Sequence, residues 1–146
     1  MRNRRLAFNM SLAAGLFIGL PAATAQAAES VTFQAPSGNI ACVIASDGSG
    51  AGLVRCDIGT FTYVPTAAPA DCHVKYGHTL EISRTDGVGF SCAHDTMIGS
   101  SYSVLNYGQT IRNGSIECSS DVSGITCTDT STRHYFYVSR QDYRMG

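Results

Sequence analysis

Short apolar stretches separated by turn residues recur along the chain from residue 31 to residue 139. Alternating apolar and polar positions predict half-buried strands, and clusters of Gly, Asp, Ser and Pro predict the turns between them. Nowhere do eleven or more residues show the apolar spacing of an amphipathic helix. The pattern predicts strands at residues 31–34, 39–45, 53–58, 61–64, 79–84, 88–93, 109–112, 115–119, 125–128 and 134–139. It therefore predicts an all-β fold, a small disulfide-stapled barrel or sandwich of short antiparallel strands in a single domain.

The clearest hairpin lies between residues 79 and 93. Leu80 and Ile82 alternate with polar residues, a Thr-Asp-Gly turn follows at residues 85–87, and Val88 and Phe90 resume the alternation. Asp-Gly between two alternating runs is a strong short-range hairpin signal. We expect these two strands to pair with each other.

The first thirty residues have the pattern of a secretory signal peptide. Three arginines precede a mostly apolar run from residue 6 to residue 20, and of two A-x-A sites, at residues 23–25 and 25–27, the second predicts cleavage after Ala27. A membrane anchor is the alternative, but Asn9 and Ser11 interrupt the run, which is shorter than the roughly 20 residues that span a bilayer. We expect residues 1–27 to be a signal peptide and residues 28–146 to form a secreted or periplasmic domain.

Removal of the leader changes the charge balance. Three of the ten basic residues lie in it and none of the eleven acidic ones, so the mature chain carries seven basic against eleven acidic residues, a net charge of −4. Nucleic acids and anionic lipids attract clustered Lys and Arg, and Lys75 is the only lysine of the chain. The sequence therefore favours neither nucleic acid nor a membrane surface as a partner, and it contains no cofactor motif.

All six cysteines follow the predicted leader, and an even number in a small exported chain indicates a disulfide framework. Two pairs sit in similar segments, NIAC and LVRCD around one polar loop, SIEC and GITCT around another. Each segment is typical of a hairpin with one cysteine on each arm, where opposed Cα atoms are close enough for a disulfide. The predicted pairs are Cys42 with Cys56, Cys118 with Cys127 and, by elimination, Cys72 with Cys92.

Cysteine also serves as a metal ligand and as a catalytic nucleophile. His73 follows Cys72 directly and His94 lies two residues after Cys92, which is a zinc-like set of ligands, but neither a C-x-x-C nor a C-x-x-H pair occurs. A catalytic cysteine would leave an odd number of partners. We expect no metal and no reactive thiol.

The two cysteine hairpins form a weak internal repeat, 76 residues apart. The repeat is consistent with a pseudo-symmetric molecule. It is equally consistent with two hairpins that merely share the requirements of a disulfide, and the sequence favours this simpler interpretation.

Enzyme motifs are absent from the sequence: no paired-carboxylate, nucleophile-elbow or phosphate-loop pattern occurs. The imidazole of His94 and the carboxylate of Asp95 are adjacent, but neighbouring residues of a strand point to opposite faces. We therefore predict no catalytic residue.

Tyrosines gather in the C-terminal half of the chain, and tyrosine offers a rigid apolar ring with a polar tip to a partner. In the segment HYFYVS, Tyr135 and Tyr137 share one face of the predicted strand. The alternative is that the rings pack at the edge of the core with wet hydroxyls. Residues 97–107 suit a loop or irregular strand that can meet a partner. The candidate partner-binding residues are Tyr102, Tyr107, Tyr135, Tyr137, His94 and His134.

Five segments together resemble a known family: FQAPSGNIACVI, VRCDI, VLNYGQT, GITCTD and HYFYVSRQDYR. In type and order they are similar to an uncharacterised family of small exported bacterial proteins, a domain of unknown function. The resemblance covers residues 33–144, and PSGNI-x-C is its most specific piece. A departure occurs at RHYF, where Arg133 and Tyr135 replace the glycines that flank the histidine in many relatives. The resemblance implies bacterial export and a disulfide-stapled β domain, and it implies no activity.

These observations favour a binding or inhibitor-like module in the bacterial envelope or outside the cell. The partner is an unknown protein or envelope ligand, and the oligomeric state is left open. A structural envelope protein and a hydrolase with an unrecognised site are the alternatives.

Overall fold

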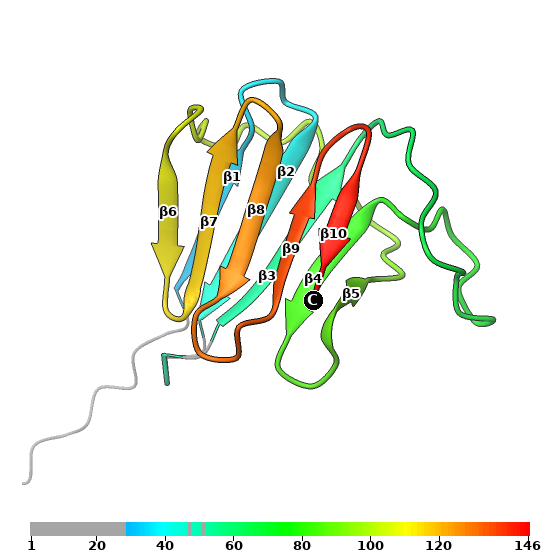
Figure 1. Cartoon of the computed structure of the whole chain (residues 1–146), viewed down its shortest axis with the longest axis horizontal. Coiled ribbons are helices and arrows are strands. Elements are labelled where there is room, and N and C mark those ends of the chain that lie inside the picture. The colour runs from blue at the N-terminus through cyan, green and yellow to red at the C-terminus, as the bar shows by residue number, and fades with distance from the viewer. Residues whose placement is uncertain (1–28, 47, 51) are drawn as a thin grey trace, which may run out of the picture.

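The computed structural model describes residues 29–46, 48–50 and 52–146 (Figure 1). The predicted signal peptide, residues 1–27, lies outside the described residues. Within the described part the chain forms strands and loops and no helix. The strands are β1 (Ser30–Gln34), β2 (Ile40–Ser46), β3 (Gly52–Ile58), β4 (Thr79–Ser83), β5 (Gly87–Phe90), β6 (Thr110–Asn113), β7 (Ile116–Asp121), β8 (Gly124–Asp129), β9 (Tyr135–Val138) and β10 (Tyr143–Met145).

The strands form two antiparallel sheets of five. Sheet A has the order β1-β2-β3-β4-β5 and sheet B the order β10-β9-β8-β7-β6, so each strand pairs with its neighbour in sequence. Figure 1 shows one sheet in front of the other, and β2 contacts β6, β3 contacts β7 and β4 contacts β9 across the interior. The predicted all-β, single-domain fold is confirmed, and of its two forms the molecule adopts the sandwich.

Alternation along the strands builds the core between the sheets. Phe33, Ile44, Leu80, Ile116 and Phe136 are all within 1% of complete burial and come from strands of both sheets. Residues between them on the same strands face outward, as the period of two requires. One shared interior therefore holds the two sheets together.

The disulfides join the pairs that the hairpin pattern predicts. Cys42 and Cys56 face each other across β2 and β3, and Cys118 and Cys127 across β7 and β8, with Cα atoms 4.1 Å apart in both pairs. Cys56 Sγ and Cys127 Sγ are 3.9 Å apart, so the two hairpin disulfides touch in the centre of the core. The third disulfide, which joins Cys72 to Cys92, lies between two loops.

The internal repeat extends well beyond the cysteines. In each sheet, one row of inward-facing residues crosses all five strands and includes the two cysteines of the hairpin disulfide. The two rows correspond strand by strand. The row of sheet A is Phe33, Cys42, Cys56, Leu80 and Phe90; that of sheet B is Ile111, Cys118, Cys127, Phe136 and Met145. The two halves thus share strand order, disulfide position and register, which favours the pseudo-symmetric interpretation of the repeat.

One predicted strand is absent from the structure, and one strand of the structure was not predicted. Residues 61–64 form no strand, although Phe61 and Tyr63 do face inward in alternation. Only Thr62 makes a backbone hydrogen bond there, donating from N to Arg140 O at 2.7 Å, so no ladder of hydrogen bonds forms. β10 was not predicted, because three residues are too short to show a period of two.

A long crossing segment, residues 91–109, leads from sheet A to sheet B. It passes over the outer side of β3, where Met97 N donates to Asp57 Oδ2, and then reaches the free edge of β1. There Val104 forms a parallel bridge with Gln34, and Leu105 N donates to Gln34 O at 2.9 Å. The outer face of sheet A is thereby partly covered by the chain itself.

Candidate binding groove

A groove of about 550 Å³ lies where β3 ends and β4 begins, beside the crossing segment. We call it the walled groove; residues 57–59, 74–75, 78–79, 93–96 and 98 line it. The end of β3 and the start of β4 form its floor. Residues 74 and 75 form one wall, and residues 93–98 form the other. Small-molecule sites commonly have volumes of a few hundred Å³, so the groove is large enough for a small ligand or a short peptide segment.

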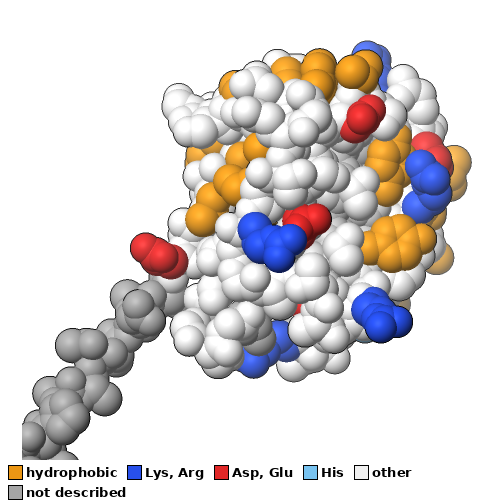
Figure 2. Space-filling model, turned by 60° about the vertical axis from the view of Figure 1, so that its left-hand side comes forward, with side chains coloured by type: hydrophobic (Ala, Val, Ile, Leu, Met, Phe, Trp, Pro, Cys, Tyr) orange, Lys and Arg blue, Asp and Glu red, His pale blue; other side chains and the backbone are white. Residues whose placement is uncertain are grey.

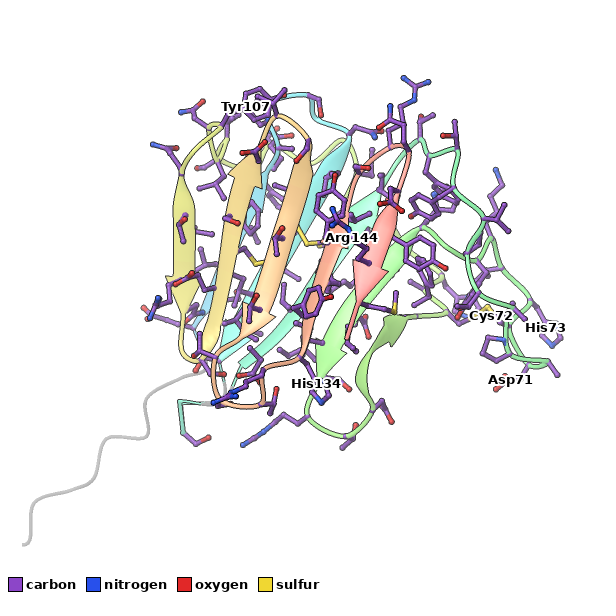
Figure 3. All side chains as sticks on the ribbon, viewed as in Figure 1. Asp71, Cys72, His73, Tyr107, His134 and Arg144 are labelled. Atoms are coloured by element: carbon purple, nitrogen blue, oxygen red, sulfur yellow. A yellow bond between two sulfur atoms is a disulfide. The ribbon has the colours of Figure 1, made fainter. Side chains whose placement is uncertain are left out.

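A disulfide fixes the distance between the two walls. Cys72 precedes Val74 and Lys75 by two and three residues, and Cys92 directly precedes Ala93 and His94. Figure 3 shows Cys72 with Asp71 and His73 on the loop that projects from the side of the sandwich. Because neither wall belongs to a strand, the covalent link holds them together where backbone ladders cannot.

An ion-pair network fixes the second wall to the sheet. Arg55 Nε and Nη2 donate to both carboxylate oxygens of Asp57 at 2.9 Å, while Nη1 donates to Asp95 Oδ1 at 3.0 Å. Asp57 is buried, and Thr79 Oγ1 also donates to it, at 2.9 Å. Two-point contacts between guanidinium and carboxylate are strong and directional. The network therefore locks residue 95, and with it the wall, onto β3.

The same contacts shift two pKa values. The hydrogen bond to Asp57 raises the pKa of Arg55, an effect that burial opposes. The hydrogen bond from Arg55 lowers the pKa of Asp95, which is exposed. Both shifts favour the charged forms, so the network is an ion pair at neutral pH.

Three side chains bring polar groups to the groove. His78 Nδ1 lies 2.8 Å from Ile58 O and, because a carbonyl only accepts, this nitrogen carries a proton and leaves Nε2 for a ligand. The side chains of Lys75 and His94 make no hydrogen bond or ion pair within the described part of the chain. Apolar walls accompany them, since Ile58, Val74, Ala93 and Ile98 also line the groove.

The loop before His78 requires a glycine at position 77. Its φ is +93°, and a Cβ there would lie 2.7 Å from Pro65 Cγ, so both conformation and space require glycine. Tyr63 Oη donates to Gly77 O at 2.7 Å, and its ring stacks on Phe61 at 4.2 Å and contacts Tyr143 at 5.0 Å. Burial, with a smaller effect of Tyr143, raises the pKa of Tyr63. This aromatic cluster connects the floor of the groove to the core.

The structure separates the predicted partner-binding residues. His94 lies in the walled groove. Tyr135 and Tyr137 share the outer face of β9, where Tyr135 is 40% exposed and the guanidinium of Arg144 lies 4.4 Å from the ring centre of Tyr137. Tyr102 belongs to the crossing segment, and its carbonyl accepts a hydrogen bond from Gln34 Nε2.

Tyr107 and His134 occupy opposite ends of the sandwich (Figure 3). Tyr107 is 48% exposed and lines a second groove of about 400 Å³, the end groove, formed by residues 35, 37, 39–40, 60, 107, 121–124 and 139–141. His134 lies beside Gly87 at the turn between β4 and β5. The four tyrosines and two histidines therefore do not form one continuous site.

Sequence reasoning missed four groove residues: Arg55, Asp57, Lys75 and His78. One signal was available. Arg55 and Asp57 share a face of the strand VRCDI, and two opposite charges on one face of an otherwise apolar strand indicate that the face is covered or functional. Lys75 and His78 lie in or beside a loop, where no periodic pattern marks them.

In the described part of the chain, no group of three or more His, Cys, Asp and Glu side chains is placed to hold a metal ion. The carboxylate of Asp95 accepts from Arg55, and no hydrogen bond between described residues joins His94 to a carboxylate. Figure 2 shows charged side chains singly or in mixed pairs, without a patch of one sign on that face.

The fold and the groove define a disulfide-stapled β-sandwich with a lateral groove. Residues 12–145 match DUF6636, a family of unknown function, and the chain belongs to that family. No curated protein and no solved structure matches the chain. Three disulfides indicate an oxidising, extracytoplasmic environment. Among the described residues, none forms a helix with the length and hydropathy to cross a bilayer.

Proposed function

We propose that this protein is an exported binding module of the bacterial envelope or the extracellular medium, and that its ligand occupies the walled groove. The observation that carries the proposal is the convergence of Lys75, His78 and His94 on one groove with apolar walls. These groups come from two segments, the loop that ends at His78 and the crossing segment, and a disulfide and an ion-pair network hold them in place. Convergent polar groups in an apolar groove are the usual form of a binding site.

A hydrolase is supported less well, because the charged groups of the groove are arranged as a structural ion pair and not as a nucleophile with its base. A purely structural role requires only the stapled fold and leaves the convergence of donors without a use. An inhibitor-like role is one form of binding, in which the partner is a protein.

The proposal is tested by blocking the groove. Immobilised mature protein, the variant Ala93→Phe and the control Val122→Phe are incubated with envelope extract, and the retained material is identified by mass spectrometry. Ala93 lines the groove, whereas Val122 is 79% exposed in the turn between β7 and β8. We expect the unmodified protein and Val122→Phe to retain the same component and Ala93→Phe to lose it, with similar melting temperatures for all three. Equal retention by all three proteins contradicts the proposal, as does the absence of any retained component.

A further inference from the structure

The acidic groups at the walled groove are already held by the protein. Asp57 Oδ1 accepts from Arg55 Nε and Thr79 Oγ1, and Asp57 Oδ2 accepts from Arg55 Nη2 and Met97 N. Asp95 Oδ1 accepts from Arg55 Nη1, and Arg55 Nη2 also donates to the carbonyl of Asp95. Both oxygens of Asp57 are therefore fully engaged, and one oxygen of Asp95 is held by Arg55.

The basic groups at the groove are in the opposite condition. Lys75 has three N–H donors, and no hydrogen bond or ion pair of the described residues uses them. His94 is likewise without a hydrogen bond in the described part of the chain, and His78 keeps Nε2 after its bond to Ile58. The donors that remain for a ligand thus belong to Lys75 and His94, whereas Nε2 of His78, with the ring proton on Nδ1, is an acceptor.

From this asymmetry we propose that the walled groove takes a ligand with a carboxylate head and a short apolar body, a further step that rests on the binding function proposed above. The carboxylate accepts a charge-assisted hydrogen bond from Lys75 and a hydrogen bond from a ring N–H of His94. The apolar body lies against Ile58, Val74, Ala93 and Ile98. A fatty acid and the free C-terminus of a peptide share this chemistry.

Octanoate, octan-1-ol and octylamine serve as probes, together with an N-acetylated tripeptide ending in leucine that carries either a free or an amidated C-terminus. Affinities for the full mature protein are measured by titration calorimetry and by NMR shifts. We expect octanoate or the free-acid peptide to bind, and the alcohol, the amine and the amidated peptide to bind at least tenfold more weakly. The acid that binds more tightly shows whether the ligand is a fatty acid or the C-terminus of a peptide.

Three variants locate the carboxylate. Lys75→Gln and His94→Gln should each weaken binding of the acid about tenfold. His134→Gln is the matched control, because residue 134 precedes β9 as residue 78 precedes β4, and the carbonyl of each accepts a backbone hydrogen bond from the last residue of the preceding strand. The control should leave the affinity unchanged.

Equal or tighter binding of octylamine overturns the carboxylate assignment, as does tight acid binding that the Lys75 and His94 variants leave unaltered. Failure of every probe also overturns it. In each of these cases the blocking experiment with Ala93→Phe still decides the binding function separately, because it uses envelope material and not the probes.

Discussion

Asp129, the last residue of β8, shows how a single buried carboxylate is kept ionised. Burial alone would raise its pKa, but Ser131 donates to Oδ1 twice, from N at 2.9 Å and from Oγ at 2.6 Å. These hydrogen bonds outweigh burial and lower the pKa of Asp129 below its ordinary value. The turn that leads into β9 is thus organised around a charge.

The lowered pKa of Asp129 predicts a contribution to acid sensitivity. A carboxyl with a lower pKa in the folded than in the unfolded state stabilises the fold above the unfolded pKa of about 4, and this contribution is lost as the pH falls through the folded pKa. We expect Asp129→Asn to be less stable than the unmodified protein at pH 7 and to lose less stability between pH 4 and pH 2. Melting temperatures across this range test it, with Asp71→Asn as control. Parallel curves for Asp129→Asn and the unmodified protein would contradict the assignment.

The tyrosines differ in their contacts with the core, so truncating them should change the free energy of unfolding by different amounts. Tyr63 is stacked, hydrogen-bonded and packed against the core, whereas Tyr107 is half exposed. We expect Tyr63→Ala to lower the free energy of unfolding by about 3 kcal/mol and Tyr107→Ala to change it by less than about 0.5 kcal/mol. Urea titration of both variants measures the difference. A large loss for Tyr107→Ala would exclude a free recognition surface at that residue.

At the scale of elements, the loop at residues 59–78 and the segment at residues 91–98 depend on each other. Neither belongs to a strand ladder over most of its length, and the Cys72–Cys92 disulfide joins them. Both cysteines are partly exposed, whereas the four cysteines of the hairpin disulfides are fully buried. The walled groove therefore rests on the most accessible of the three disulfides.

Mild reduction should open this element alone. A dithiol reductant transfers two electrons, becomes a cyclic disulfide and leaves Cys72 and Cys92 as thiols. We expect alkylation at these two cysteines first, and faster amide hydrogen exchange in residues 59–78 and 91–98 with little change in the strands. Peptide mapping by mass spectrometry follows both. Alkylation of Cys42 or Cys118 at the same reductant concentration would show that the core opens together with the loops.

The described part of the molecule consists of two similar halves, and neither half buries a core by itself. Each half contributes one face of the interior, and the two hairpin disulfides meet between the faces. A five-stranded sheet with one apolar face requires a second layer to cover it. The halves should consequently unfold together.

Removal of one central disulfide tests this coupling. We expect the double variant Cys118→Ala, Cys127→Ala to lose about 3 kcal/mol of stability and still to unfold in one transition. Circular dichroism of the strands and fluorescence of the tyrosines should then give the same midpoint. Two separate transitions would indicate that the sheets fold independently.

Much of this architecture follows from local sequence. Nine of the ten strands in the described part correspond to predicted segments, because alternation with a period of two depends only on neighbouring residues. The pairing of Cys42 with Cys56 and of Cys118 with Cys127 was predictable for the same reason, since a short hairpin places its two arms in register. Residues 61–64 show the limit: their alternation is real, but no neighbouring strand receives their hydrogen bonds.

The groove and its chemistry were decided by tertiary structure. Arg55 meets Asp95 forty residues further along the chain, and Lys75, His78 and His94 converge only because the crossing segment returns over β3. The choice of sandwich over barrel likewise depends on how two complete sheets pack. Hydrophobic period and short loops are local properties that a sequence carries by itself, whereas the meeting of distant segments depends on the packing of the whole chain, which no local pattern encodes.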